Sequence, residues 1–145
     1  MRKSLLLAAA LVLVLASTAF AVSYKTGTYK AGSATRDGVT LRIASGSFSV
    51  SRISFMETCS NASDSFTDRV TFVKGSAAKL DGTIDRDGRL SGRYKGLGGT
   101  ITVTGSVKGS AATVKGTESG RYTPPESTAS YTCRGSKTFQ ATRSG

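Results

Sequence analysis

The chain contains nine acidic residues and no histidine, so carboxylates are the side chains that could carry catalytic chemistry. Without histidine there is no Ser-His-Asp or Cys-His nucleophile and no histidine-based metal site. Two carboxyl groups about 5–10 Å apart can hydrolyse a glycosidic bond. Asp81 and Asp85 would have about this separation if both project from one face of an extended strand.

Neighbouring arginines argue against this chemistry. In the hairpin predicted for this segment, Asp81 faces Arg93 and Asp85 faces Arg89 across an antiparallel ladder. An ion pair keeps each carboxylate ionised and leaves the pair without a general acid. We therefore interpret these acids as cross-strand ion pairs on a solvated face, and we expect the chain not to be an enzyme.

Glu57 is the acid with the least ordinary position. It shares its parity with Ile53, Phe55 and Cys59, so its side chain could point inward near the cysteine and contact a ligand if a cavity lies there. The alternative that we favour places it at the end of a strand, in solvent.

Cys59 and Cys133 are the two cysteines of the chain, and we interpret them as the single disulfide of an exported protein. Closing so long a loop would stabilise the fold by roughly 4 kcal/mol. A reactive thiol or a metal-binding pair is the alternative, but there is no Cys-x-x-Cys motif. The sequence also lacks a P-loop and a dinucleotide fingerprint, so we expect no metal and no cofactor.

The N-terminus has the pattern of a secretory signal peptide, residues 1–21. Arg2 and Lys3 precede an apolar run at residues 5–15, and Ala19-Phe20-Ala21 has the small residues of a cleavage site. The run is too short to span a membrane. We predict cleavage after Ala21, leaving residues 22–145 as one domain that is secreted, or periplasmic if the source has an outer membrane.

The remaining chain is punctuated by Gly and Thr and lacks helical periodicity, which favours an all-β fold. Residues 82–92 predict a hairpin in which Ile84 faces Leu90, Gly82 faces Gly92, and Gly88 is the left-handed third residue of the loop.

The same Gly-Thr-Ile skeleton recurs 17 residues later, at residues 99–109. It predicts a second hairpin with Ile101 opposite Val107 and a left-handed Gly105 in its loop.

Other segments alternate in the same way. A shift in the parity of apolar residues near Ser51-Arg52 predicts a β-bulge, and Pro124-Pro125 requires a loop. We predict an antiparallel meander of about eight to ten strands that closes into a small up-and-down β-barrel, because closure leaves no free edge. A sandwich is the alternative.

Two stretches resemble a group of small secreted bacterial β-meander proteins of unknown function. The closing stretch reads Cys-Arg-Gly-Ser at residues 133–136, then Phe-x-Ala-x-Arg at residues 139–143, where the group usually has a tryptophan in place of Phe139. The matching features of the opening half are Gly-Thr-Tyr at residues 27–29, the strands at residues 38–43 and 48–50, and Cys59. The resemblance implies a disulfide, a β-meander and secretion, and it implies no activity. The Gly-Thr-Tyr start is also similar to avidin-like and lipocalin-like barrels, a likeness of fold alone.

Charge provides the main functional hypothesis. The chain has 20 basic and nine acidic residues, and removal of Arg2 and Lys3 leaves a charge near +9. A candidate anion-binding face is formed by Arg86, Arg89, Arg93 and Lys95. We predict a non-catalytic binding or surface-associated module for an anionic cell-envelope polymer or a small ligand, and we expect no nucleic acid partner. The alternative is a secreted protease inhibitor acting through a rigid loop at residues 122–126.

Overall fold

A computed structural model describes residues 21–33, 35–96 and 98–145. The predicted signal peptide lies outside them, except for Ala21. Nine strands form the described chain: β1 (Gly27–Gly32), β2 (Gly38–Ala44), β3 (Ser47–Ser60), β4 (Ser65–Val73), β5 (Leu80–Ile84), β6 (Arg89–Gly96), β7 (Gly99–Lys108), β8 (Ala111–Tyr122) and β9 (Tyr131–Ser144). In this part of the chain there is no helix that could cross a membrane.

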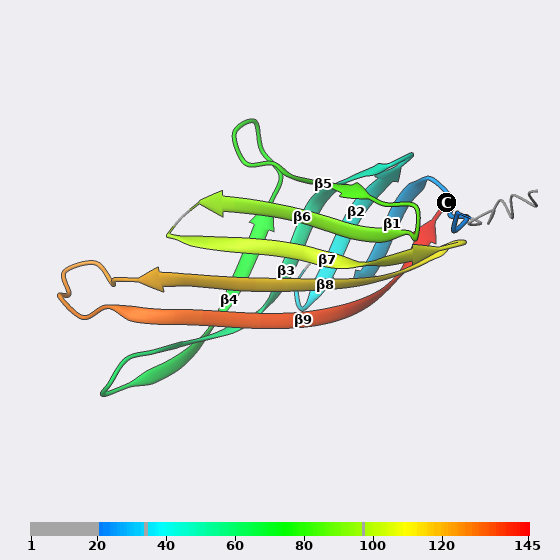
Figure 1. Cartoon of the computed structure of the whole chain (residues 1–145). Coiled ribbons are helices and arrows are strands. Elements are labelled where there is room, and N and C mark those ends of the chain that lie inside the picture. The colour runs from blue at the N-terminus through cyan, green and yellow to red at the C-terminus, as the bar shows by residue number, and fades with distance from the viewer. Residues whose placement is uncertain (1–20, 34, 97) are drawn as a thin grey trace, which may run out of the picture.

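All pairings between these strands are antiparallel, and they run in a ring. From β1 the ring passes through β2, β3, β5, β6, β7, β8 and β9, and β9 pairs with β1 again. β4 lies outside this ring, pairs with β3 and runs at a steep angle to β6–β9 (Figure 1). The predicted all-β antiparallel meander is therefore confirmed, with nine strands.

The long strand β3 connects the two sides of the fold. Its first half pairs with β2 and β5, and its second half pairs with β9 and β4. Thr40 pairs with Arg52 while Leu41 pairs with Val50, so Ser51 is the extra residue of a bulge. The predicted bulge is confirmed, and it is what changes the parity of the inward-facing residues along β3.

The interior of the ring is filled by aromatic and branched side chains. The largest fully buried ones are Tyr29, Phe55, Leu41, Ile43, Ile53 and Leu80. Tyr29 also donates a hydrogen bond from its hydroxyl to the carbonyl of Lys25 at 2.7 Å, so its polar end is satisfied. Burial on this scale stabilises a fold by about 25 cal/mol for each Å² of apolar surface removed from water.

The first predicted hairpin is confirmed. Ile84 pairs with Leu90 and Gly82 pairs with Gly92 between β5 and β6. Gly88 has a φ of 75°, and its N–H donates to the carbonyl of Asp85 at 3.0 Å. A residue with a Cβ would be strained at this φ, which explains the glycine.

The second predicted hairpin is wrong, because residues 99–108 form the single strand β7. Ile101 pairs with Tyr94 on β6 and not with Val107. Gly105 does have a positive φ, 148°, but it lies within the strand. Residues 102–104 read Thr-Val-Thr where the first copy reads Asp-Arg-Asp, so β-branched residues that favour strands replace the turn residues.

Candidate functional site

The predicted basic residues lie on the outward side of β6 and in the turn before it. Arg89, Arg93 and Lys95 are exposed on one face of the strand, and Arg86 is exposed in the turn between β5 and β6. Their parity is opposite to that of Leu90, which is buried in the core. Arg89, Arg93 and Lys95 therefore share the outer side of the molecule, and Arg86 is exposed at the turn.

The ion pairs predicted for two of these arginines are wrong. The carboxylate of Asp85 accepts hydrogen bonds from the backbone N–H groups of Asp87 and Arg89, each at 2.9 Å. A short aspartate reaches the N–H groups of its own turn more easily than a guanidinium across the ladder. The β5–β6 pairing ends at Gly82, so Asp81 has no ladder position opposite Arg93. Among the described residues, the ion pairs join Asp37 to Arg69 and to Lys137 instead.

The outward side of β6 continues across β7, β8 and β9 as one face, which we call the outer face. Its rows are read from the register: Arg93, Thr102, Thr117 and Ser136 form one row, Lys95, Thr100, Ser119 and Arg134 the next, and Ser91, Thr104, Lys115 and Thr138 a third. Lys108 and Arg121 are further outward cations. Glu118 is the one acid in these four strands, and it points inward.

A second feature is a cleft of about 350 Å³ between β4 and β6. It exists because β4 pairs with β3 alone and the β5–β6 pairing stops at Gly92, leaving residues 93–96 of β6 without a partner on that side. Phe72 and Tyr94 contact each other in the cleft, with ring centroids 5.1 Å apart. Glu57 and Glu118 also line it.

These two glutamates, which we call the acid pair, meet across a glycine. Gly135 of β9 pairs with Glu57 on β3 and with Glu118 on β8. A Cβ on Gly135 would lie 2.9 Å from the Cβ of Glu57, and one on Gly120 would lie 2.8 Å from Oε1 of Glu118. Glycines at both positions therefore make the room that the two carboxyl groups occupy.

Burial, a hydrogen bond to Glu57 and the charge of Glu57 raise the pKa of Glu118 to about 8. The pair therefore holds a proton at neutral pH. Oε2 of each glutamate is shielded from solvent and has no hydrogen-bond partner within the described structure. The favoured interpretation of Glu57 as a solvent-exposed acid is wrong, and the inward alternative is confirmed. Glu118 was not among the site residues predicted from the sequence. Its inward parity between Gly116 and Gly120 is the pattern that could have indicated it.

The predicted disulfide is confirmed and lies beside the acid pair. Cys59 and Cys133 occupy directly paired positions on β3 and β9 and are bonded to each other. The carboxylate of Glu57 lies within 4.8 Å of both sulfurs, but sulfurs joined in a disulfide are not thiolate ligands. This group is therefore not a metal site in the oxidised protein.

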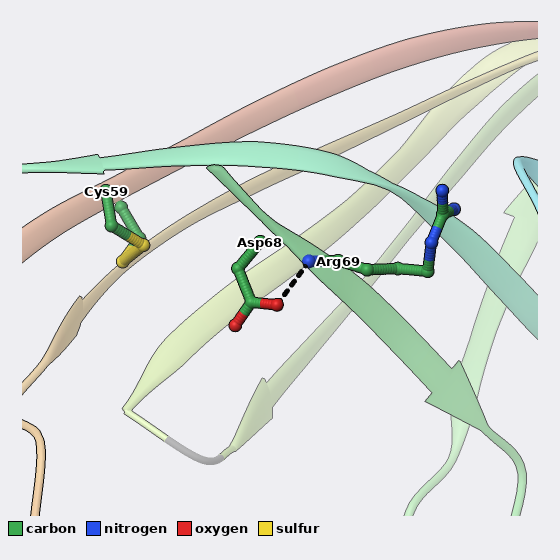
Figure 2. The surroundings of a disulfide bond; sticks show 4 residues. Cys59, Asp68 and Arg69 are labelled. Carbon is green, nitrogen blue, oxygen red and sulfur yellow. Dashed lines mark hydrogen bonds between the residues drawn. A yellow bond between two sulfur atoms is a disulfide. The ribbon is translucent and has the colours of Figure 1, made fainter. Parts of the chain in front are cut away.

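Two charged residues of β4 belong to the surroundings of the disulfide. Figure 2 shows Asp68 and Arg69 on opposite sides of the strand, with the N–H of Arg69 donating to the carboxylate of Asp68 at 2.7 Å. Asp68 pairs with Glu57 and lines a smaller hollow, of about 100 Å³, that also contacts Glu118. The guanidinium of Arg69 donates to Asp37 at 2.8 Å, so its charge is already paired.

The loop of the inhibitor hypothesis lies between β8 and β9. The N–H of Ser127 donates to the carbonyl of Pro124 at 3.2 Å, and Glu126 has a φ of 62°. Pro124-Pro125 is in a loop, as predicted. No contact of the loop bears on inhibition, so that hypothesis stays a prediction.

Strand β6 thus separates the two candidate sites. Its outward side chains belong to the outer face, and Tyr94, of opposite parity, lines the cleft.

The chain matches no protein-family model, no curated protein and no solved structure.

Proposed function

We propose that the protein is an exported, non-catalytic module that binds an anionic polymer of the cell envelope through the outer face. The observation that carries this proposal is the segregation of charge. The outward positions of β6–β9 hold seven cations and no carboxylate, and the cations are Arg89, Arg93, Lys95, Lys108, Lys115, Arg121 and Arg134.

The residue types on this face suit a repeating anionic ligand. Arginine offers planar, bidentate donors to phosphate, sulfate and carboxylate groups, and lysine adds point charges. Serine and threonine hydroxyls fill most of the positions between the cations and can bond to sugar hydroxyls or phosphate oxygens. Neighbouring strands are about 4.8 Å apart, so the face is a regular array of donors.

The absence of the predicted ion pairs strengthens the proposal. Because the carboxylate of Asp85 bonds to the backbone of its own turn, it does not hold the guanidinium of Arg89. Arg89 and Arg93 therefore remain available to an external anion. Cations that are not paired within the protein bind anions without first breaking an internal contact.

Dextran sulfate is a suitable probe because its uncharged parent, dextran, is the matched control. We expect the protein to bind dextran sulfate and not dextran, with an affinity that falls as salt rises. Charge reversal by Arg89→Glu with Arg93→Glu should weaken binding by about tenfold or more.

The control is Arg42→Glu with Lys79→Glu, which changes the net charge equally at exposed positions outside the outer face. It should weaken binding much less. Equal losses from the two double variants would show that net charge alone governs binding and would contradict a defined face. Retention that does not change with salt would also reject the proposal.

A further inference from the structure

Two carboxyl groups that line the cleft between β4 and β6 each keep one oxygen without a partner in the described structure. Oε2 of Glu57 and Oε2 of Glu118 are shielded from solvent and accept no hydrogen bond within the described structure. A buried carboxyl oxygen without a donor is unfavourable, because it has lost its hydrogen bonds to water and gained none in the fold. Gly120 and Gly135 have no side chain to compete with the glutamates for this space, since a Cβ at either position would lie within 3 Å of Glu118 or Glu57.

The walls above the acid pair are mostly apolar. The apolar lining comes from Val70 and Phe72 of β4, Ala78, Tyr94 of β6 and Ile101 of β7. Phe72 and Ile101 are buried. A volume of about 350 Å³ is within the range of small-molecule sites, which combine apolar walls with a few fixed polar groups.

The charges around the acid pair favour a cationic ligand. Asp68 of β4 lies on the same side as Glu57 and adds a third carboxylate to the adjoining hollow. Arg69 also borders the cleft, but its guanidinium bonds to Asp37 on the other side of β4. Arg121 and Tyr122 of β8 also border the adjoining hollow, but Arg121 has outward parity and its side chain belongs to the outer face.

From this arrangement we propose that the cleft binds a small organic cation, an ammonium or guanidinium group attached to an apolar body. The cationic group would donate to the carboxyl groups of Glu57 and Glu118, which line the cleft. The apolar body would lie against the contacting rings of Phe72 and Tyr94, whose faces also attract cations. This site is separate from the outer face and does not depend on the function proposed for it.

An organic cation fits better than a metal ion. Calcium takes six to eight oxygen ligands and zinc prefers nitrogen and thiolate ligands. Among the residues that the structure describes, the cleft offers a metal ion only the carboxyl groups of the acid pair as charged ligands. The sulfurs nearest to Glu57 are joined in the disulfide and are not thiolates. The apolar walls would contact an organic body and would leave a bare ion unsolvated.

The cationic ligand and a proton compete for the carboxyl groups of Glu57 and Glu118. At neutral pH the pair shares a proton, since the pKa of Glu118 is raised to about 8. Binding of a cation should therefore release protons and become tighter as the pH rises. The charged or titratable groups that border the cleft and the adjoining hollow around the pair are Asp68 and Arg69 on β4, Arg121 and Tyr122 on β8, and Tyr94 on β6.

The test compares 2-phenylethylamine with its uncharged analogue 2-phenylethanol, by NMR titration of the intact protein. We expect saturable shifts at Tyr94, Ile101 and Val70, and an affinity for the amine at least about tenfold above that for the alcohol. Raising the pH from about 6 to 8.5 should tighten amine binding while leaving the alcohol unchanged.

Two kinds of variant separate the site from general effects. Glu57→Gln with Glu118→Gln should abolish the preference for the amine and leave binding to dextran sulfate unchanged. Glu126→Gln, which removes an exposed acid in the β8–β9 loop, is the control and should have no effect. Ala78→Trp should block both probes by filling part of the cleft that Ala78 lines, without removing any charge.

Several results would overturn the proposal. These are equal affinity for the amine and the alcohol, amine binding that survives loss of the acid pair, shifts confined to residues outside the cleft, or binding of calcium in preference to the amine. If the double glutamine variant does not fold, Ala78→Trp still decides, because amine binding that persists in it would place the site elsewhere.

Discussion

Glu57 and Glu118 share one neighbour, Gly135, which pairs with Glu57 from one side and with Glu118 from the other. Adjacent strands are about 4.8 Å apart, so the two glutamate positions lie about twice that distance apart on the backbone. Their side chains can meet because the residue between them has none. The acid pair is therefore a property of three strands, not of one motif.

Gly135 should be sensitive to the smallest possible substitution. A Cβ there would lie 2.7 Å from the carbonyl oxygen of Met56 and 2.9 Å from the Cβ of Glu57. Because backbone must move to admit it, Gly135→Ala should lower the free energy of unfolding by about 1–3 kcal/mol in urea denaturation. Gly75→Ala is the matched control, since a Cβ on Gly75 meets nothing within 4 Å. Equal effects of the two changes would contradict the close approach.

Stability should fall as the pH rises from about 4.5 to about 8. The pKa of Glu118 is raised from 4.5 to about 8 in the fold, so its protonated form is favoured there. The stability that this proton provides is fully present below the unfolded pKa, near 4.5, and is lost as the pH rises through about 8. The melting temperature of the wild type should therefore drop between about pH 5 and 9, by at least about 4 °C.

Glu118→Gln should remove most of this pH dependence, because an uncharged amide replaces the protonated acid. Glu126→Gln should leave the curve as it is in the wild type. Thermal melts at several pH values test both variants. Parallel curves for Glu118→Gln and the wild type would mean that another group is responsible.

The part of the fold that could be predicted depends on local chemistry. The β5–β6 hairpin followed from Gly88 and the acidic turn before it, and the bulge at Ser51 followed from the parity of β3. The hairpin predicted at residues 99–109 was wrong because the glycine spacing there matches that of residues 82–92, whereas the turn residues between the glycines differ. Glycine spacing alone does not define a turn when β-branched residues lie between the glycines.

The candidate sites were less predictable, for a different reason. Arg89 and Arg93 share a strand, so alternation alone placed them on one face. The acid pair instead depends on β9 lying between β3 and β8, a pairing between segments far apart in the chain. The cleft depends on where the β5–β6 ladder stops, which the residues of the hairpin do not encode by themselves.

Two glycines with positive φ allow the cost of backbone strain to be measured separately from the cost of a steric clash. Gly88 and Gly46 have φ values of 75° and 73°, but a Cβ on Gly88 would clash with the carbonyl oxygen of Val107 while one on Gly46 meets nothing within 4 Å. Gly46→Ala should cost about 1 kcal/mol from backbone strain alone. Gly88→Ala should cost more, by about a further 1–2 kcal/mol. Chemical denaturation measures the difference, and equal losses would refute the contact with Val107.

The disulfide should account for a large part of the stability. Cys59 and Cys133 are separated by 74 residues and join β3 to β9 next to the acid pair. Replacing both with serine should lower the free energy of unfolding by roughly 4 kcal/mol, since the unfolded chain is no longer restricted by the cross-link. Urea denaturation of the wild type, with and without reductant, gives the same comparison without mutation, and the reduced wild type should match the double serine variant. If reduction leaves the urea midpoint of the wild type unchanged, the strand pairings of the ring alone hold β3 against β9 and the cross-link contributes little.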